Sequence, residues 1–204
     1  MKILFSFLLG FSVIQAQVKE VKIGKQVWMA ENLNVSTFRN GDPIPQAKTA
    51  EEWAKADENQ QPACCYYENN AENGKTYGLL YNWYAVNDKR GLAPAGYHIP
   101  TFAEWTTLTD YLGGVEVAGT KMKSTSGWNE NGNGTNSSGF NALPGGARLF
   151  NGTFLYIGGY GYWWSSTEFN TYSAWYRNLV YNDGYVNRSN YGKKNGFSVR
   201  CLRD

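Results

Sequence analysis

The sequence has almost no excess charge of either sign. Its 204 residues contain 19 lysines and arginines against 17 aspartates and glutamates, a formal net charge of +2 at pH 7. A protein that binds nucleic acid through counterion release needs a concentrated positive surface, so we expect no nucleic-acid partner. The chain also has a single histidine, His98, and no Cys-x-x-Cys pair. The common zinc-binding patterns are therefore missing.

The sequence also lacks an apolar run long enough to cross a bilayer. The run at residues 3–14 follows Lys2 and ends close to Ala16. A basic start, a short apolar run and a small residue at the end are typical of a secretory signal. We expect residues 1–16 to be a signal peptide and residues 17–204 to be one domain without a membrane span. After cleavage near Ala16 the protein would be secreted, periplasmic or held at the cell surface; a buried N-terminal element is the alternative.

Cysteine is scarce, and its number is odd. Cys64, Cys65 and Cys201 are the only three, so one stays unpaired if the others form a disulfide in an oxidising compartment. Adjacent cysteines rarely bridge each other because the geometry is strained. Either Cys64 or Cys65 could therefore pair with Cys201, and three buried free thiols are the alternative.

The residues that are abundant predict one folded α+β domain. Hydrophobic residues make up 42% and aromatic residues 16% of the chain, which is enough for a sizeable core. The 23 glycines exceed the usual share of about 7%, so many turns are expected. Helix patterns lie in the middle and strand patterns at both ends, which predicts an α+β fold with the terminal strands paired in one sheet.

Local patterns place the elements. Residues 18–29 predict a β-hairpin that turns at Gly24-Lys25. The two main helices are expected at 79–90, from an apolar i, i+4, i+7 pattern, and at 102–112, from a capping box at Thr101 and Glu104. A shorter helix at 50–57 follows a second capping box. From Phe140 onward short strand-like runs alternate with glycine and asparagine, which predicts a loop-rich β region without helices.

Six segments in order along the chain carry a resemblance to a known family. They are residues 22–33 (Lys-Ile-Gly-Lys-Gln-Val-Trp-Met-Ala-Glu-Asn-Leu), 77–83 (Tyr-Gly-Leu-Leu-Tyr-Asn-Trp), 96–101 (Gly-Tyr-His-Ile-Pro-Thr) with Glu104-Trp105, 138–140 (Ser-Gly-Phe), 163–168 (Trp-Trp-Ser-Ser-Thr-Glu) and 196–201 (Gly-Phe-Ser-Val-Arg-Cys). Together they resemble the Fibrobacter succinogenes major paralogous domain family over residues 21–204. More distantly, residues 98–105 and 196–201 are similar to the formylglycine-generating sulfatase-modifying enzymes.

This resemblance implies a single C-type-lectin-like domain, secreted or attached to a bacterial surface, of undetermined molecular activity. Many relatives have Cys-Pro where this chain has Ala93-Pro94, so the resemblance favours Cys65 as the disulfide partner of Cys201. The sulfatase-modifying enzymes use a redox-active cysteine pair in their C-terminal half, whereas this chain has only Cys201 there. Their activity is therefore not expected.

No complete catalytic group is evident, and we expect the protein not to be an enzyme. A Ser-His-Asp or Cys-His arrangement would have to include His98, whose place just before a helix cap predicts a buried imidazole bonded to the backbone. Glu104, Glu168 and Asp183 qualify as glycosidase carboxylates by type only. Glu104 is more simply a capping residue, and nothing brings the other two together.

The richest signal lies in residues 151–192, where 27 of 42 residues are Tyr, Asn, Gly, Ser or Trp. This is the composition of binding loops, because aromatic side chains give contact area and the small polar ones give adaptable hydrogen bonds. The same residue types also suit sugars, whose ring faces stack on aromatic side chains and whose hydroxyl groups bond to polar ones. The expected ligand-binding residues are Tyr172, Trp175, Tyr176, Tyr181, Asn182, Asp183, Tyr185, Asn187 and Tyr191. The alternative is that the aromatic residues form a β core, which we expect for Trp163 and Trp164.

The sequence thus predicts a secreted, non-catalytic recognition domain that binds carbohydrate. A protein-binding or surface-assembly module is the alternative, and an enzyme of the sulfatase-modifying fold is a weaker one. No cofactor is expected except calcium, for which residues 128–136 and Asn182-Asp183 offer oxygen ligands. Solvated turns are the alternative reading of those two segments.

Overall fold

The computed structural model describes residues 18–204. The expected signal peptide lies outside the described residues. None of the helices in this part of the chain combines the length and the apolar character that a bilayer crossing requires.

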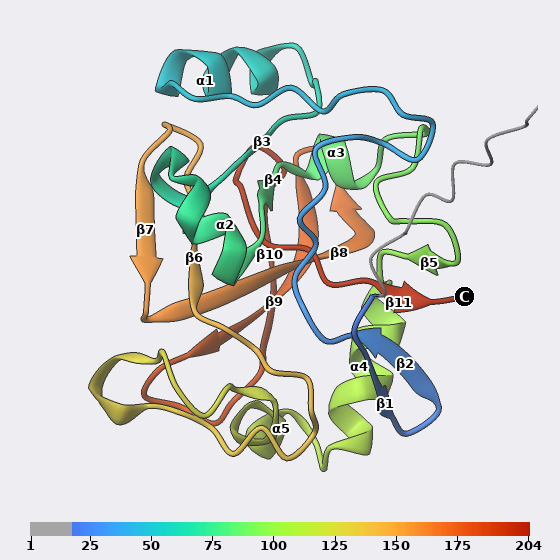
Figure 1. The fold of residues 1–204 in the computed structure, drawn as a ribbon, viewed down its shortest axis with the longest axis vertical. Helices are drawn as coiled ribbons and strands as arrows, with labels where there is room; N and C mark the ends of the chain where they lie inside the picture. The colour runs from blue at the N-terminus through green and yellow to red at the C-terminus, as the bar shows by residue number, and fades with distance from the viewer. Residues whose placement is uncertain (1–17) are drawn as a thin grey trace, which may run out of the picture.

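A four-stranded sheet joins the two ends of the domain, in the order β1-β2-β11-β5. Its strands are β1 (Glu20–Ile23), β2 (Gln26–Met29), β5 (Tyr97–His98) and β11 (Leu202–Arg203). Figure 1 shows β1 and β2 as a hairpin beside the C-terminal strand. Gly24 in the turn has a φ of 61°, a left-handed conformation that glycine adopts readily. The predicted hairpin and the predicted pairing of the terminal strands are confirmed.

A five-stranded sheet contains most of the aromatic C-terminal region, in the order β10-β9-β8-β6-β7. A further pair, β3 with β4, forms a separate two-stranded sheet. The strands are β3 (Cys64–Cys65), β4 (Leu80–Tyr81), β6 (Gly145–Arg148), β7 (Phe154–Ile157), β8 (Tyr160–Asn170), β9 (Ser173–Val180) and β10 (Asn187–Gly192).

Both capping boxes form as predicted. The Thr49 hydroxyl accepts a hydrogen bond from Glu52 N at 3.1 Å, and the Thr101 hydroxyl accepts one from Glu104 N at 3.2 Å. The five α-helices of residues 18–204 are α1 (Ala50–Glu58), α2 (Ala71–Tyr77), α3 (Trp83–Val86), α4 (Phe102–Tyr111) and α5 (Val115–Met122). Two single 3-10 turns occupy Tyr67–Asn69 and Asn129–Asn131. The prediction of an α+β fold is confirmed.

The helix expected at 79–90 is wrong over most of its length. Leu80 and Tyr81 form β4, and only Trp83–Val86 is helical. Tyr81 exchanges backbone hydrogen bonds with Phe197 at 2.9 and 3.1 Å, and the Asn82 side chain caps the short helix by accepting from Ala85 N. Long-range strand pairing therefore overrides the helical spacing. Helices α2 and α5 were not predicted.

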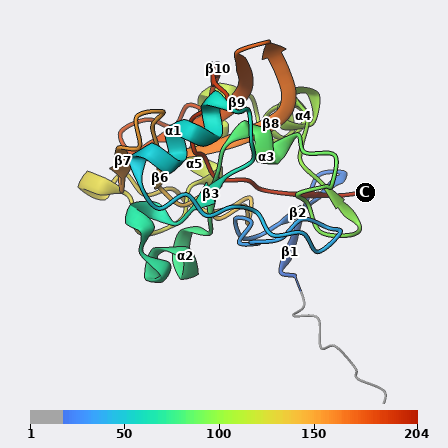
Figure 2. The ribbon, with the colours of Figure 1, turned by 90° about the horizontal axis from the view of Figure 1, so that it is seen from above.

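The two adjacent tryptophans of β8 confirm their predicted place in the core. Trp163 and Trp164 are almost fully buried and belong to different hydrophobic clusters, because neighbouring strand residues point to opposite faces. On the sheet face of Trp163, the Trp163 ring packs against Phe140, and Phe140 packs in turn against Trp105 of α4 and Trp28 of β2. The Trp164 side packs against Phe197. Figure 2 shows the β8–β9 hairpin and α2 on opposite sides of the molecule.

Candidate functional site

One face of the five-stranded sheet is lined with tyrosines. In an antiparallel sheet, residues directly opposite each other point to the same face. Tyr162 lies opposite Asn178, and Asn178 lies opposite Asn187. Two residues further along each strand, and so on the same face, Tyr176 lies opposite Ser189. Tyr191 follows two positions later on β10, so tyrosine, asparagine and serine side chains share this face.

Phe197 forms the base on which these rings pack. Its ring centroid lies 4.8 Å from that of Tyr162, 5.3 Å from that of Tyr176 and 6.1 Å from that of Tyr191. Phe197 is nearly fully buried, and its backbone is held by the two hydrogen bonds with Tyr81 of β4. The tyrosines therefore rest on a fixed support.

Tyr156 of β7 completes the arrangement from the other side. Its ring centroid lies 4.9 Å from that of Tyr160 and 6.3 Å from that of Tyr162. Tyr156 has a φ of 73°, a conformation that a bulky residue rarely adopts and that costs about 1–3 kcal/mol. Such strain gathers at ligand-binding positions, which makes Tyr156 a candidate binding residue.

Together these residues line a hollow of about 120 Å³, which we call the aromatic hollow. It is lined by Ala147, Leu149, Tyr156, Tyr162, Tyr176, Tyr191 and Phe197. The side chains of Tyr156 and Tyr191 are 46% and 43% exposed and form its rim. None of the lining residues carries a charge at neutral pH.

The phenol groups of the aromatic hollow are neutral and available. Burial raises the pKa of Tyr162 and that of Tyr176, although a hydrogen bond from Ser189 opposes the shift at Tyr176. Among residues 18–204, the hydroxyl groups of Tyr156, Tyr162 and Tyr191 have no hydrogen-bond partner. Tyr156 and Tyr191 are partly exposed and Tyr162 Oη is not among the fully buried unpaired atoms, so all three hydroxyls are accessible and can bond to a ligand.

The structure brings together three of the predicted binding residues. Tyr176 and Tyr191 line the aromatic hollow, and Asn187 lies on the same sheet face. Trp175 points to the opposite face, where its ring packs between Phe102 at 4.6 Å and Phe169 at 5.0 Å. Tyr172 is 82% exposed at the β8–β9 turn.

The other four predicted residues, Tyr181, Asn182, Asp183 and Tyr185, lie in the β9–β10 loop next to α5. This loop surrounds the buried ammonium of Lys123. Lys123 Nζ donates to the backbone carbonyls of Gly132 at 2.7 Å, Asp183 at 2.9 Å, Tyr181 at 3.1 Å and Val180 at 3.2 Å. Converging carbonyls of this kind also suit hard cations, but here they bind an ammonium. No group of three or more His, Cys, Asp or Glu side chains suited to a metal occurs in the described part of the chain.

Three lining aromatic residues, Tyr156, Tyr162 and Phe197, were not predicted. Tyr162 alternates with Tyr160 along a strand, a period-2 signal that points both side chains to one face. Phe197 lies inside the C-terminal Gly-Phe-Ser segment, whose only signal in the sequence is the family resemblance. Tyr156 has no comparable signal, because its position depends on the pairing of β6 with β7.

The expectation of a backbone-bonded His98 is wrong. Its Nδ1 lies 2.8 Å from Asp204 Oδ1 and its Nε2 lies 2.9 Å from Glu104 Oε1. Burial alone would lower the pKa of His98, but the hydrogen bonds that its ring donates to the two carboxylates outweigh it and raise the pKa. The imidazolium thus ties β5 to the start of α4 and to the last residue of the chain.

The candidate carboxylates lie in three separate settings. Glu104 bonds to His98, Glu168 of β8 pairs with the buried Lys193, and Asp183 accepts from Tyr185 N at 2.9 Å within its loop. The structure does not assemble them into an acid–base pair.

A second, more open hollow of about 360 Å³ lies beside His98. Apart from the Ser166 hydroxyl, its polar side chains are already engaged. The Arg39 guanidinium donates to the carbonyls of Ala93 and Tyr97, and Asp88 pairs with Arg90 at 2.8 Å. The aromatic hollow, with its free hydroxyls, is therefore the better candidate site.

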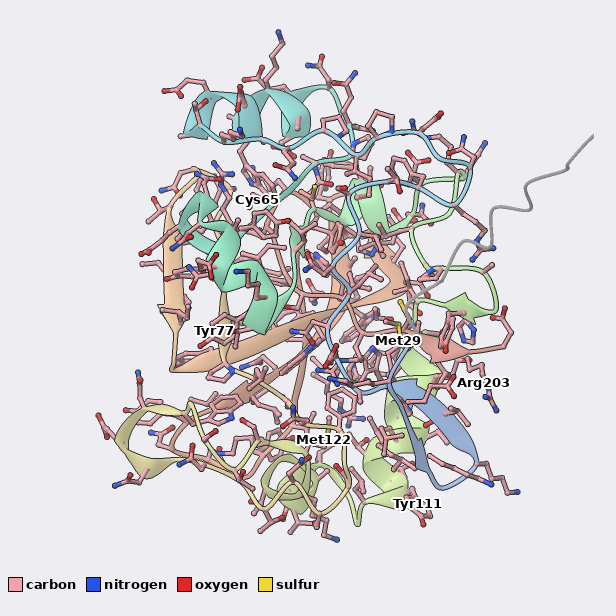
Figure 3. All side chains as sticks on the ribbon, in the orientation of Figure 1. Met29, Cys65, Tyr77, Tyr111, Met122 and Arg203 are labelled. Atoms are coloured by element: carbon pink, nitrogen blue, oxygen red, sulfur yellow. The ribbon has the colours of Figure 1, made fainter. Side chains whose placement is uncertain are left out.

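The predicted Cys65–Cys201 disulfide is not present in the structure. All three cysteines are free and buried. Cys65 packs with Trp53 and Tyr67, whereas Cys201 belongs to the cluster around Phe197 and its carbonyl accepts from Met29 N at 2.9 Å. Figure 3 shows the labelled Cys65 and Met29 well apart. Burial raises the pKa of Cys65 to about 11 and that of Cys64 and Cys201 to about 12.

Comparison with known proteins identifies one similarity. Residues 21–203 match the family described as the Fibrobacter succinogenes major domain. No curated protein and no solved structure shows significant similarity to the chain.

Proposed function

We propose, for a chain that belongs to the Fibrobacter succinogenes major domain family, a non-catalytic recognition function in which the aromatic hollow binds carbohydrate. One observation carries the proposal: four tyrosines and Phe197 converge on an uncharged hollow, and three of the tyrosine hydroxyls have no partner among residues 18–204.

Sugars fit this chemistry because they present an apolar ring face and a rim of hydroxyl groups. Aromatic side chains offer large contact area with little rotamer entropy to lose, and phenol hydroxyls both donate and accept hydrogen bonds. Hydrophobic walls with a few well-placed polar groups are typical of small-molecule sites. The strained backbone of Tyr156 supports a binding role for the rim, since strain of this kind clusters at ligand-binding positions.

The proposal extends to the scaffold and the location. The two chain ends pair in one sheet, and a loop-rich β region forms a second sheet. Both features support a C-type-lectin-like domain, which the family resemblance implies. The N-terminal sequence supports export and cleavage near Ala16. The separate settings of Glu104, Glu168 and Asp183 support a role without catalysis.

A binding assay with matched rim variants tests the proposal. Protein starting at Gln17 is run in native gels that contain different polysaccharides, alongside Tyr156→Ala and Tyr191→Ala. We expect retardation by at least one polysaccharide, and about a tenfold or greater loss of affinity in each variant, the effect of losing a well-packed aromatic contact.

Tyr172→Ala is the control, because Tyr172 is more exposed than either rim residue yet lies outside the hollow. It should bind like the parent protein. Since no carboxylate lines the hollow, a chelator should leave the affinity unchanged. Retardation that survives both rim substitutions, or that Tyr172→Ala abolishes, would place the binding elsewhere.

A protein partner is the second candidate function, and the β8–β9 hairpin favours it. Phe169 and Tyr172 are exposed at the tip of this hairpin, and Trp175 packs behind Phe169. A projecting aromatic tip suits a protein surface better than a single sugar. In this case Tyr172→Ala, and not Tyr191→Ala, would reduce capture of a surface protein from the producing organism.

A further inference from the structure

The size of the aromatic hollow limits what it can hold. Pockets that bury a drug-sized ligand typically measure about 300–1,000 Å³. The aromatic hollow, at about 120 Å³, has less than half of that lower bound. It therefore has room for about one ring of a saccharide, with the neighbouring rings outside it.

Its electrostatics limit the ligand further. All seven lining residues are uncharged, and burial raises the pKa of Tyr162 and of Tyr176, so these phenols stay neutral. A carboxylate or sulfate group that entered would lose its hydration and find no cation. Burying an unpaired charge is strongly unfavourable, so a charged ring should bind less tightly than a neutral one.

The polar groups around the hollow match hydroxyls instead. Tyr156, Tyr162 and Tyr191 offer three hydroxyl groups. On β9, directly opposite Tyr162, Asn178 is only 6% exposed, and its side-chain amide, which is not among the fully buried unpaired groups, makes no hydrogen bond within the described residues. An amide group has two donors and an acceptor carbonyl, so it can bond to a sugar hydroxyl without any charge on either partner.

We infer that the aromatic hollow selects a single uncharged sugar ring and rejects uronate and sulfated sugars. This inference rests on the proposed function and specifies its substrate class. Its physical basis is the combination of small volume, uncharged lining and unpartnered neutral hydrogen-bonding groups.

Paired oligosaccharides that differ only in charge test the inference. The probes are gluco-, manno- and galacto-oligosaccharides, each compared with the same chain oxidised at C6 to the uronate. We expect at least one neutral chain to bind and its uronate to bind at least about tenfold more weakly, a difference of about 1.4 kcal/mol. Tyr176→Ala should abolish binding of both. Because one ring is held, a hexasaccharide should bind no more than about threefold tighter than a disaccharide, about 0.7 kcal/mol.

The outcomes separate the inference from the function beneath it. A uronate that binds as tightly as its neutral partner, with both losing affinity in Tyr176→Ala, would overturn the charge selection while carbohydrate binding at the hollow stands. A steep rise in affinity with chain length would overturn the single-ring limit. If no chain in the panel binds to folded protein, the proposed function and the inference both fail. Trp175→Ala, on the opposite sheet face, is the matched control and should behave like the parent protein.

Discussion

A single side-chain oxygen, Oδ1 of Asn32, accepts hydrogen bonds from three buried donors. Trp163 Nε1 lies 2.9 Å from it, Arg200 Nη2 lies at 2.7 Å and Arg200 Nε at 3.1 Å. The amide nitrogen of Asn32 donates to the Tyr77 carbonyl at 2.9 Å. These residues come from four of the six segments that carry the family resemblance. The network therefore gives a physical reason for finding an asparagine, a tryptophan and an arginine in these distant segments: each supplies a donor or acceptor that the others require.

Asn32→Ala tests this network. Arg200 would remain fully buried with fewer acceptors, and Trp163 would lose its only one, so we expect unfolding free energy to fall by about 3 kcal/mol, the scale for leaving a buried charged donor unpaired. Urea denaturation measures the change. Asn34→Ala is the control, since it removes only the exposed residue's bond to the Gly74 carbonyl and should cost about 1 kcal/mol or less. Equal losses in the two variants would contradict the account.

At the scale of elements, His98 holds three pieces of the chain together. Its imidazolium bonds to Glu104 at the start of α4 and to Asp204 just after β11. Burial alone would raise the pKa of Glu104, but hydrogen bonds from Thr101 and His98 outweigh it and lower the pKa. We call His98 with Glu104 and Asp204 the clamp. The pKa values of His98 and Glu104 therefore shift in opposite directions, as expected for an ion pair.

The clamp predicts a pH dependence of stability. Because the folded pKa of His98 is raised, its contribution is complete below the ordinary value of about 6.5 and disappears as the pH rises through the higher folded pKa. Because that of Glu104 is lowered, its contribution holds above about 4.3 and disappears as the pH falls. The stability difference between the parent and His98→Ala should thus be largest at about pH 5–6.5. Urea midpoints across the pH range measure it, with Lys19→Ala as an exposed-pair control; a difference that grows above pH 7 would contradict the clamp.

Elements that depend on neighbours in sequence were predictable, and those that depend on distant pairing were not. The capping boxes of α1 and α4 and the hairpin at Gly24 need only residues a few positions apart. The segment at Leu80 and Tyr81 has helical spacing, yet it pairs with β3 and with Phe197. For the site, composition identified Tyr176 and Tyr191. It could not separate them from Trp175, because the face of each residue depends on the register of β9.

At the scale of the whole molecule, packing rather than a covalent bridge joins the middle of the chain to its C-terminus. Cys64 and Cys201 lie in one large hydrophobic cluster that also includes Phe38, Tyr81 and Trp83. Seven tryptophans are at most 4% exposed across the three clusters, namely Trp28, Trp53, Trp83, Trp105, Trp128, Trp163 and Trp164. Burial of large aromatic side chains contributes much of the core energy, and Cys64, Cys65 and Cys201 pack in these clusters as free thiols.

Thiol labelling tests whether the fold is free of disulfides. Thiolates react and thiols do not, so the raised pKa values and burial predict no labelling of native protein by iodoacetamide at pH 8. After denaturation without a reductant, mass spectrometry should find all three cysteines labelled. A single labelled cysteine in protein purified from an oxidising compartment would reveal a bridge and contradict the structure.

The most direct test of the central claim, that the aromatic hollow binds carbohydrate, is an NMR titration of protein carrying ¹³C-labelled tyrosine rings. A polysaccharide that binds in the gel assay is added, with ring signals assigned by single Tyr→Phe variants. We predict shifts at Tyr156, Tyr162, Tyr176 and Tyr191 and none at Tyr172 or Tyr111, which are exposed elsewhere. Shifts confined to Tyr172, with the four tyrosines of the hollow unchanged, would contradict the account.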